Sequence, residues 1–238
     1  MIQNQHSDMT ETPTCLKPLL SDVPISEVYL MDCMELMKQY PDNYFDLAVV
    51  DPPYGIGAGG SFGHYWDSTK GKAAKSGIRN KKKNWDNETP ILAYFIELIR
   101  ISQNQIIWGG NYFTDKLPIS RGWICYDKKQ PETNSFGKFE LAWTSFNKIP
   151  LKFEYYPTHV TQGTRIHPTQ KPVKLYDWIF KNYATEGMKI LDTHLGSGSS
   201  RIAANKAKLN FVGCEIDNEY FVSANKRYND FISQTRLF

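Results

Sequence analysis

The sequence predicts an α/β protein with a doubly wound, mostly parallel sheet. Three observations support this fold class. Short apolar runs of strand character recur along the chain, helical patterns separate most of them, and two runs end in an acidic residue followed by a Pro-rich or Gly-rich turn. Because ligands of open α/β sheets bind at the carboxyl ends of strands, we expect the functional crevice at these turns.

Seven segments have the composition of strands. They cover residues 27–31, 45–50, 105–109, 123–127, 139–145, 188–192 and 210–214. Apolar residues recur at helical spacing within 90–102 and 173–183, and a further helix is expected over 218–230. No clear helix separates 123–127 from 139–145, so these two strands are predicted to pair as a hairpin.

Length and composition indicate one catalytic domain over residues 25–238, preceded by a flexible polar tail over 1–24. The tail lacks the basic and apolar regions of a signal peptide, and no apolar run is long enough to span a membrane. We therefore expect a soluble cytoplasmic protein. The four cysteines are far apart, which predicts reduced thiols and no metal site.

Four consecutive residues after the strand 45–50, Asp51-Pro52-Pro53-Tyr54, are suited to bind an exocyclic amine. The Asp51 carboxylate and the Pro52 carbonyl can accept the two amine hydrogens and direct the nitrogen lone pair outward. The prolines fix φ and remove backbone donors, and the Tyr54 ring offers a face for stacking on a base. We predict that these four residues are catalytic. The alternative is an ordinary turn capped by Asp51.

A glycine turn follows the strand 188–192 and precedes a helical pattern. Gly196 and Gly198 allow a ligand to approach the backbone, and Ser199 can cap the helix. The strand 210–214 ends at Glu215, at about the 20-residue offset typical of a carboxylate that binds ribose hydroxyls. Together these features predict a nucleoside cofactor site. The third glycine of the dinucleotide-binding pattern is absent, and a glycine turn without a ligand is the alternative.

These motifs together resemble the DNA amino-methyltransferases that use S-adenosylmethionine. The resemblance rests on Asp51-Pro-Pro-Tyr54, His167-Pro-Thr-Gln-Lys-Pro172 and Asp192-Thr-His-Leu-Gly-Ser-Gly-Ser199. Because the tetrapeptide precedes the glycine turn, the order resembles the circularly permuted beta class. That class implies a Rossmann-like seven-stranded sheet with an antiparallel edge hairpin. It also implies that the helix 218–230 leads back in space toward the strand at Glu27.

The resemblance implies roles for further residues. Asp32 corresponds to an acid that contacts the cofactor's adenine amine, and Lys171 to a lysine that pairs with the methionine carboxylate. The expected cofactor contacts are Asp32, Cys33, His167, Thr169, Lys171, Asp192, Thr193, Gly196, Gly198, Ser199, Glu215 and Ile216. Without the resemblance, spacing favours Asp32 as a helix N-cap with Glu35 three residues later, and Lys171 as a solvated side chain. In the turn after Trp108, Asn111 is expected to cap a helix.

The segment 55–88 is predicted to be a basic insertion that contacts DNA. Its basic residues are not interrupted by an acid between residues 70 and 83, although the net charge of the whole chain is only +3. Such residues can neutralise phosphates, and Arg165 is expected to assist them. The predicted DNA-binding set is Lys70, Lys72, Lys75, Arg79, Lys81, Lys82, Lys83 and Arg165. A solvated surface loop is the alternative.

The expected reaction is transfer of a methyl group from S-adenosylmethionine to the N6 amine of adenine in double-stranded DNA, after the base is flipped out of the helix. Within the resembled family, Asp at the first catalytic position is more frequent among adenine enzymes. Alternatives are methylation of cytosine N4, an RNA or protein acceptor, and a catalytically silent DNA-binding relative. A homodimer and a cognate restriction endonuclease are the further expected partners.

Overall fold

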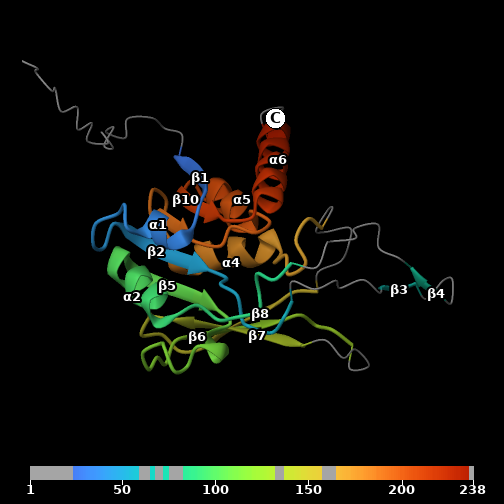
Figure 1. The fold of residues 1–238 in the computed structure, drawn as a ribbon, viewed down its shortest axis with the longest axis horizontal. Coiled ribbons are helices and arrows are strands. Elements are labelled where there is room, and N and C mark those ends of the chain that lie inside the picture. Colours follow the sequence, from blue (N-terminus) through green and yellow to red (C-terminus); the bar gives the residue numbers. More distant parts are fainter. Residues whose placement is uncertain are drawn as a thin grey trace, which may run out of the picture.

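The computed structural model describes residues 24–58, 65–67, 72–74, 83–131, 137–156 and 165–235. Eight strands form one sheet in the order β1-β10-β9-β2-β5-β7-β6-β8 (Figure 1). Their bounds in that order are Ser26–Leu30, Asn210–Glu215, Lys189–Asp192, Phe45–Val50, Ser102–Trp108, Phe139–Thr144, Trp123–Asp127 and Leu151–Glu154. A separate two-stranded hairpin, β3 (Tyr65–Asp67) with β4 (Lys72–Ala74), lies within the predicted insertion.

The first five strands in this order are parallel to their neighbours, as predicted for a doubly wound sheet. The first strand of the chain lies beside the last, because β1 pairs with β10 from Ser26↔Phe211 to Leu30↔Glu215. The Arg201 guanidinium also joins β1 to the final helix by donating to both Ser26 and Asn225. This neighbourhood agrees with the circular permutation that the motif order implies.

All seven predicted strands are present, and the sheet gains an eighth. The predicted hairpin is β6 with β7, which pair antiparallel from Trp123↔Trp143 to Asp127↔Phe139. Its predicted place at the sheet edge is wrong, because β8 pairs parallel with β6 and forms the edge instead. The sequence Leu151-Lys-Phe-Glu154 has only two apolar positions, and its alternating exposure suits a short edge strand that needs little burial.

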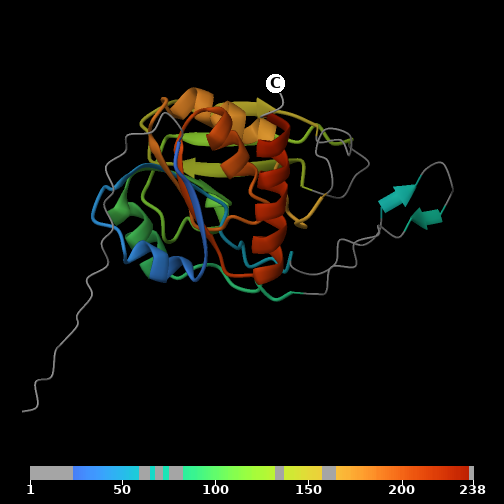
Figure 2. The same ribbon diagram turned by 90° about the horizontal axis from the view of Figure 1, so that it is seen from above.

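Helices cover both faces of the sheet (Figure 2). One face packs against α4 (Val173–Tyr183), α5 (Ser199–Lys206) and α6 (Asn218–Thr235). The other packs against α1 (Cys33–Met37) and α2 (Leu92–Ile101). Neighbouring strand residues alternate between the two cores, so Ile190 belongs to one and Leu191 to the other. Burial on both faces explains why central strands such as β2 and β9 are mostly apolar.

Several sequence predictions lie outside the described residues. They are most of the tail 1–24 and, in the basic insertion, Lys70, Lys75, Arg79, Lys81 and Lys82. Lys72 belongs to β4, but its side chain is not described. Within the described part of the chain, no helix has the length and apolar character needed to cross a membrane.

Candidate active site

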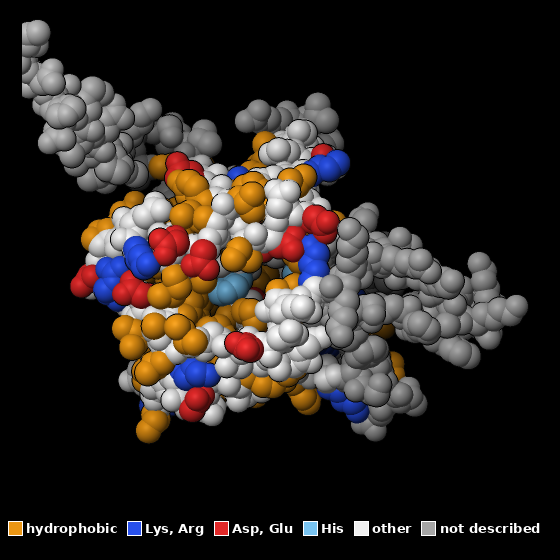
Figure 3. Space-filling view, in the orientation of Figure 1, with side chains coloured by type: hydrophobic (Ala, Val, Ile, Leu, Met, Phe, Trp, Pro, Cys, Tyr) orange, Lys and Arg blue, Asp and Glu red, His pale blue; other side chains and the backbone are white. Residues whose placement is uncertain are grey.

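The two distant sequence motifs meet at the carboxyl ends of two central strands of the sheet. β2 and β9 are parallel neighbours, with Leu47↔Ile190 and Ala48↔Leu191 in register, so the turns after both strands open on the same side. The Tyr94 hydroxyl from α2 lies 2.7 Å from the Thr193 hydroxyl and closes the far side of the glycine turn. Figure 3 shows a hollow near the middle of this face, with histidine side chains inside it. The crevice predicted at the strand ends is therefore present.

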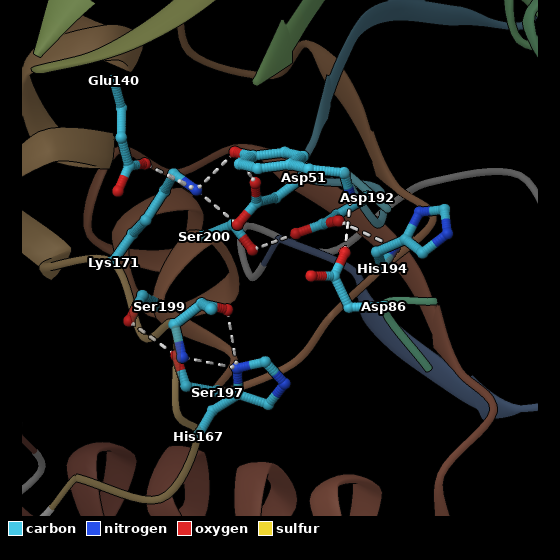
Figure 4. A network of polar contacts seen from close by, with 12 residues as sticks. Asp51, Asp86, Glu140, His167, Lys171, Asp192, His194, Ser197, Ser199 and Ser200 are labelled. Carbon is cyan, nitrogen blue, oxygen red and sulfur yellow. Dashed lines mark hydrogen bonds and ion pairs between the residues drawn. The ribbon is translucent and has the colours of Figure 1, made fainter. Parts of the chain in front are cut away.

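A buried polar network surrounds Asp51 (Figure 4). Tyr54 donates its hydroxyl hydrogen to one Asp51 oxygen at 2.6 Å, and Lys171 donates to the other at 2.5 Å. The Lys171 ammonium, with only 4% of its side chain exposed, also lies 3.1 Å from Glu140 on β7. Lys128 pairs with the same glutamate at 2.5 Å. Both oxygens of the catalytic carboxylate candidate are therefore held by donors.

Burial and the neighbouring charges act in opposite directions on the pKa values of this network. Burial raises the pKa of Asp51, although the adjacent Lys171 ammonium acts in the opposite direction. Burial also acts to raise the pKa of Glu140, but Lys171 and Lys128 outweigh it and hold that pKa at about 2. Lys171 stays protonated because the two carboxylates outweigh its own desolvation and raise its pKa. The ammonium thus keeps Glu140 ionised and opposes the protonation that burial favours at Asp51.

The Tyr54 ring packs closely against the turn after β5. Gly109 has φ +72°, and a Cβ atom placed there would lie 2.2 Å from the ring, so only glycine fits. Tyr112 stacks on Tyr54 with ring centres 5.1 Å apart and planes inclined by 15°. The predicted cap by Asn111 is wrong, because Gly109 precedes a short 3-10 helix, Gly110–Tyr112, that contains Asn111. The turn after β5 therefore packs against Tyr54 through Gly109 and stacks the Tyr112 ring on it.

The glycine turn and Glu215 form the second half of the site. Gly196 and Gly198 have φ +50° and +68°, which side chains rarely adopt. Glu215 accepts the Gly196 N–H with one oxygen and the Asp217 N–H with the other, both at 2.9 Å. Burial raises the pKa of Glu215. The carboxylate thus lies directly against the predicted loop, and its contact with ribose stays a prediction.

Asp192 has a supporting position behind the turn. It accepts the His194 N–H at 3.0 Å and the Ser200 hydroxyl at 2.5 Å, and only 2% of the residue is exposed. Burial raises its pKa to about 7. Ser199 does not cap α5 with its side chain, because Gly198 is the N-cap and Ser199 is the first helical residue. Its hydroxyl instead lies 3.1 Å from that of Ser197.

Asp32 is an N-cap in the structure and also lies at the sheet edge beside Glu215. Its carboxylate accepts the Met34 N–H at 2.8 Å and the Glu35 N–H at 3.3 Å. Since Leu30 pairs with Glu215, the two acids follow neighbouring strand ends. Cys33 is half-buried, and burial raises its thiol pKa to about 11. Ile216 is 67% exposed next to Glu215. The cap and a cofactor contact by Asp32 are geometrically compatible.

The His167 segment closes over the glycine turn. A Cβ atom placed on Gly196 would lie 3.8 Å from the His167 ring, and the ring also packs on Tyr220 of α6 at 4.3 Å. Thr169 lies beside the ring, with its hydroxyl 3.1 Å from Nδ1. Burial lowers the pKa of His167 to about 3, so the ring is neutral. We call the glycine turn with Glu215 the cofactor half of the site, and Asp51–Tyr54 with their partners the catalytic half. The His167 segment contributes to both, because His167 lies beside Gly196 and Lys171 lies beside Asp51.

The two members of the predicted DNA-binding set whose side chains are described have intramolecular partners. The Lys83 ammonium lies 2.6 Å from Asp217 and 2.8 Å from Glu219, and it sits over the Tyr220 ring. Arg165 donates to the His167 carbonyl at 3.2 Å. The Lys83 ion pairs join residue 83 to the start of α6, whereas the Arg165 bond lies within the His167 segment. The side chains of the other six members of the set are not described.

Sequence reasoning missed two acids of the site. Glu140 lies in the apolar strand Phe139–Thr144, and a single carboxylate in such a strand was the available signal. Asp86 follows Trp85 in a segment interpreted only as the end of a basic loop, yet it is 2% exposed and accepts three backbone N–H groups from residues 54–58. No group of three or more His, Cys, Asp or Glu within the described residues is arranged to hold a metal ion.

The fold and the paired motifs define a methyltransferase of the Rossmann-like class, and comparison with known proteins agrees. The family model for N6/N4 DNA methylases, described as "DNA methylase", matches residues 79–226, which is more than half of the chain. The chain therefore belongs to this family. The match begins after Asp51–Tyr54 and includes His167, the glycine turn and Glu215.

Relatives in sequence and structure are also methyltransferases. The type II methyltransferase M2.MboI of Moraxella bovis is 26% identical over 90% of this chain and 92% of its own length. The putative methylase YubD of Escherichia coli K12 is 22% identical, with 82% of this chain and 87% of YubD covered.

Among solved structures, the M1.HpyAVI–SAM complex has a TM-score of 0.53 at 20% identity and covers 84% of this chain and 98% of its own. The cytosine-N4-specific PvuII DNA methyltransferase has a TM-score of 0.55 at 10% identity, with 90% and 94% covered. These structures share the fold of this chain.

Proposed function

We propose that this DNA methylase transfers a methyl group from S-adenosylmethionine to the exocyclic N6 amine of adenine in double-stranded DNA. The observation that carries the proposal is the position of the Asp51 carboxylate at the end of β2, beside the glycine turn that follows β9. Asp in the first position of the tetrapeptide favours adenine over cytosine.

The cofactor half has the features that a nucleoside requires. Glu215 would hold the ribose, Asp32 the adenine amine, and the glycine turn would admit the rest of the molecule. His167, Thr169, Thr193 and the residues next to these acids complete the proposed contacts. When bound, S-adenosylmethionine supplies an electrophilic methyl group. Because this half opens beside Asp51, donor and acceptor can occupy one crevice.

The catalytic half accepts the amine. Asp51 and the Pro52 carbonyl would take its two hydrogens, which directs the nitrogen lone pair outward. Tyr54 holds one Asp51 oxygen, and Lys171 neutralises the charge of the other until the amine arrives. Glu140 remains as a second acceptor for the ammonium when the amine takes its place at Asp51. A base must leave the DNA stack to reach these groups, at a cost of a few kcal/mol.

DNA would be held by the basic segment before residue 83, with Lys70, Lys72, Lys75, Arg79, Lys81 and Lys82 as phosphate contacts. The names of the type II methyltransferase relatives favour a site-specific enzyme of a restriction-modification system, with a cognate endonuclease as partner. We further propose a homodimer as the working form. A DNA substrate is consistent with action in the cytoplasm.

The test is incubation with labelled S-adenosylmethionine and unmethylated genomic DNA, followed by nucleoside analysis. The expected product is N6-methyladenine, absent from a parallel reaction with Asp51→Ala. N4-methylcytosine would reject the adenine assignment while keeping the amine chemistry. Absence of label in DNA would reject the proposed activity itself.

A further inference from the structure

The short segment Lys83–Asp86 crosses from the cofactor half of the site to the catalytic half. At its start, Lys83 pairs with Asp217 and Glu219 at the beginning of α6. The Trp85 ring packs on His167, with ring centres 5.2 Å apart. At its end, Asp86 turns toward the catalytic loop (Figure 4). Three of these four consecutive residues therefore connect the two halves.

Asp86 gathers the backbone N–H groups that follow the catalytic tetrapeptide. One carboxylate oxygen accepts the N–H of Tyr54 at 2.6 Å and of Gly55 at 3.0 Å, and the other accepts the N–H of Ala58 at 2.7 Å. The Asp86 carbonyl accepts the Gly57 N–H at 2.8 Å. Such charge-assisted bonds offset the cost of burying a carboxylate that is 2% exposed.

The loop conformation around Asp86 depends on these bonds. Gly55 and Gly57 both have φ +72°, and successive N–H groups converge on one carboxylate, as in the backbone nests that bind anions. Fixing the N–H of Tyr54 also fixes the peptide plane that follows Pro53. The Pro52 carbonyl lies one residue before this peptide plane, and the Tyr54 side chain begins one bond after it. Fixing the plane therefore restricts the directions of both groups.

We propose that Asp86 is a positioning residue of the methyltransferase. It holds residues 51–58 in the conformation that presents Asp51 and the Pro52 carbonyl to the target amine, and Lys83 and Trp85 fasten it to the cofactor half. This inference rests on the proposed function and adds a residue to its machinery. The three hydrogen bonds that described residues donate to the Asp86 carboxylate all come from the catalytic loop, so the effect of a substitution begins there.

The test is Asp86→Asn, which keeps the shape but replaces one acceptor oxygen with an N–H donor that faces a backbone N–H. The expected result is a fall in kcat of about 100-fold at saturating DNA and S-adenosylmethionine, the size of effect that misplaced reacting groups produce. The dissociation constant for S-adenosylmethionine should be unchanged. Asp115→Asn, which alters an acid whose side chain is 71% exposed, is the matched control and should behave as wild type.

Hydrogen exchange gives a readout that needs no methyl transfer. In Asp86→Asn the amides of Tyr54, Gly55 and Ala58 should exchange faster, while those of Ile202 and Ala203 in α5 keep their protection. This measurement remains informative if the wild type methylates another acceptor, so the two proposals fail separately. Wild-type kcat together with unchanged exchange at these three amides would overturn the inference.

A second variant covers loss of folding by the first. Lys83→Met removes the ion pairs at the other end of the segment and leaves Asp86 in place. It should lower kcat less than Asp86→Asn does and speed exchange at the Trp85 and Asp86 amides. If Lys83→Met leaves both the exchange rates and kcat at wild-type values, the proposed fastening to the cofactor half is wrong.

Discussion

The Lys171 ammonium lies 2.5 Å from the carboxylate of Asp51, although 120 residues separate the two along the chain. The resemblance led us to expect Lys171 at the methionine carboxylate of the cofactor, and that contact stays a prediction. In the structure the lysine serves the catalytic half, where Glu140 holds it from the other side. The Lys171 ammonium opposes protonation of Asp51, the carboxylate on which the proposed amine binding depends.

Lys171→Met should move the acid limb of the pH–kcat profile to higher pH. Burial already raises the pKa of Asp51, and removing the ammonium that opposes this effect raises it further, so a larger fraction of Asp51 is protonated at a given pH. We expect kcat near neutral pH to fall about 100-fold. Lys174→Met, at an exposed position three residues later, is the control. An unshifted acid limb would contradict the assignment.

Gly109→Ala should disable the enzyme, whereas Gly57→Ala should be tolerated better. Both glycines have φ +72°, so both substitutions carry the same backbone penalty, about 1 kcal/mol or more. At Gly109 the new methyl group would overlap the Tyr54 ring, whereas at Gly57 no atom of the described residues lies within 4 Å of it. The comparison of kcat and thermal stability therefore isolates the position of Tyr54. Equal losses in both variants would refute a role for this close packing.

Asp192 should make folding stability depend on pH. Its pKa is raised to about 7 in the folded protein, against about 3.9 for an unfolded aspartate. Between these values the folded state binds more protons, so the free energy of unfolding decreases as pH rises from about 4 to 7 and then levels off. Asp192→Asn should lack this component. Urea unfolding of both proteins from pH 4 to 8 measures the difference, and parallel curves would exclude it.

Replacing Lys81 and Lys82 together with alanine should weaken DNA binding and flatten its dependence on salt, by about 0.9 in logarithmic slope for each phosphate that is no longer neutralised. Lys83→Ala should leave that slope unchanged, since its ammonium is already paired with Asp217 and Glu219. Titration of a labelled duplex at several salt concentrations compares the variants. A slope that changes only with Lys83 would reverse the assignment.

The sequence was sufficient for what depends on local pattern. Apolar runs identified the strands that end at Val50 and Asp192, and the Gly-Ser-Gly sequence identified the turn in which Gly196 and Gly198 have positive φ. Partners far apart in the chain could not be inferred in this way. A lysine such as Lys171 is usually solvated, and only the fold shows that Glu140 on β7 lies beside it. Asp86 follows a basic run, and nothing in that pattern indicates that Asp86 is buried. Leu151–Glu154 is too short and too exposed for its pattern to predict a strand.

The central position of β9 has a consequence for synthesis of the protein. This strand lies between β10 and β2, yet it belongs to the last quarter of the chain. Until β9 has been translated, the edge of β2 that will pair with β9 has no partner. Nascent chains with such unpaired edges are prone to aggregate. The nascent polypeptide thus acquires neither a complete sheet nor enzymatic competence until β9 and β10 have been translated, and products truncated before Lys189 should depend strongly on chaperones.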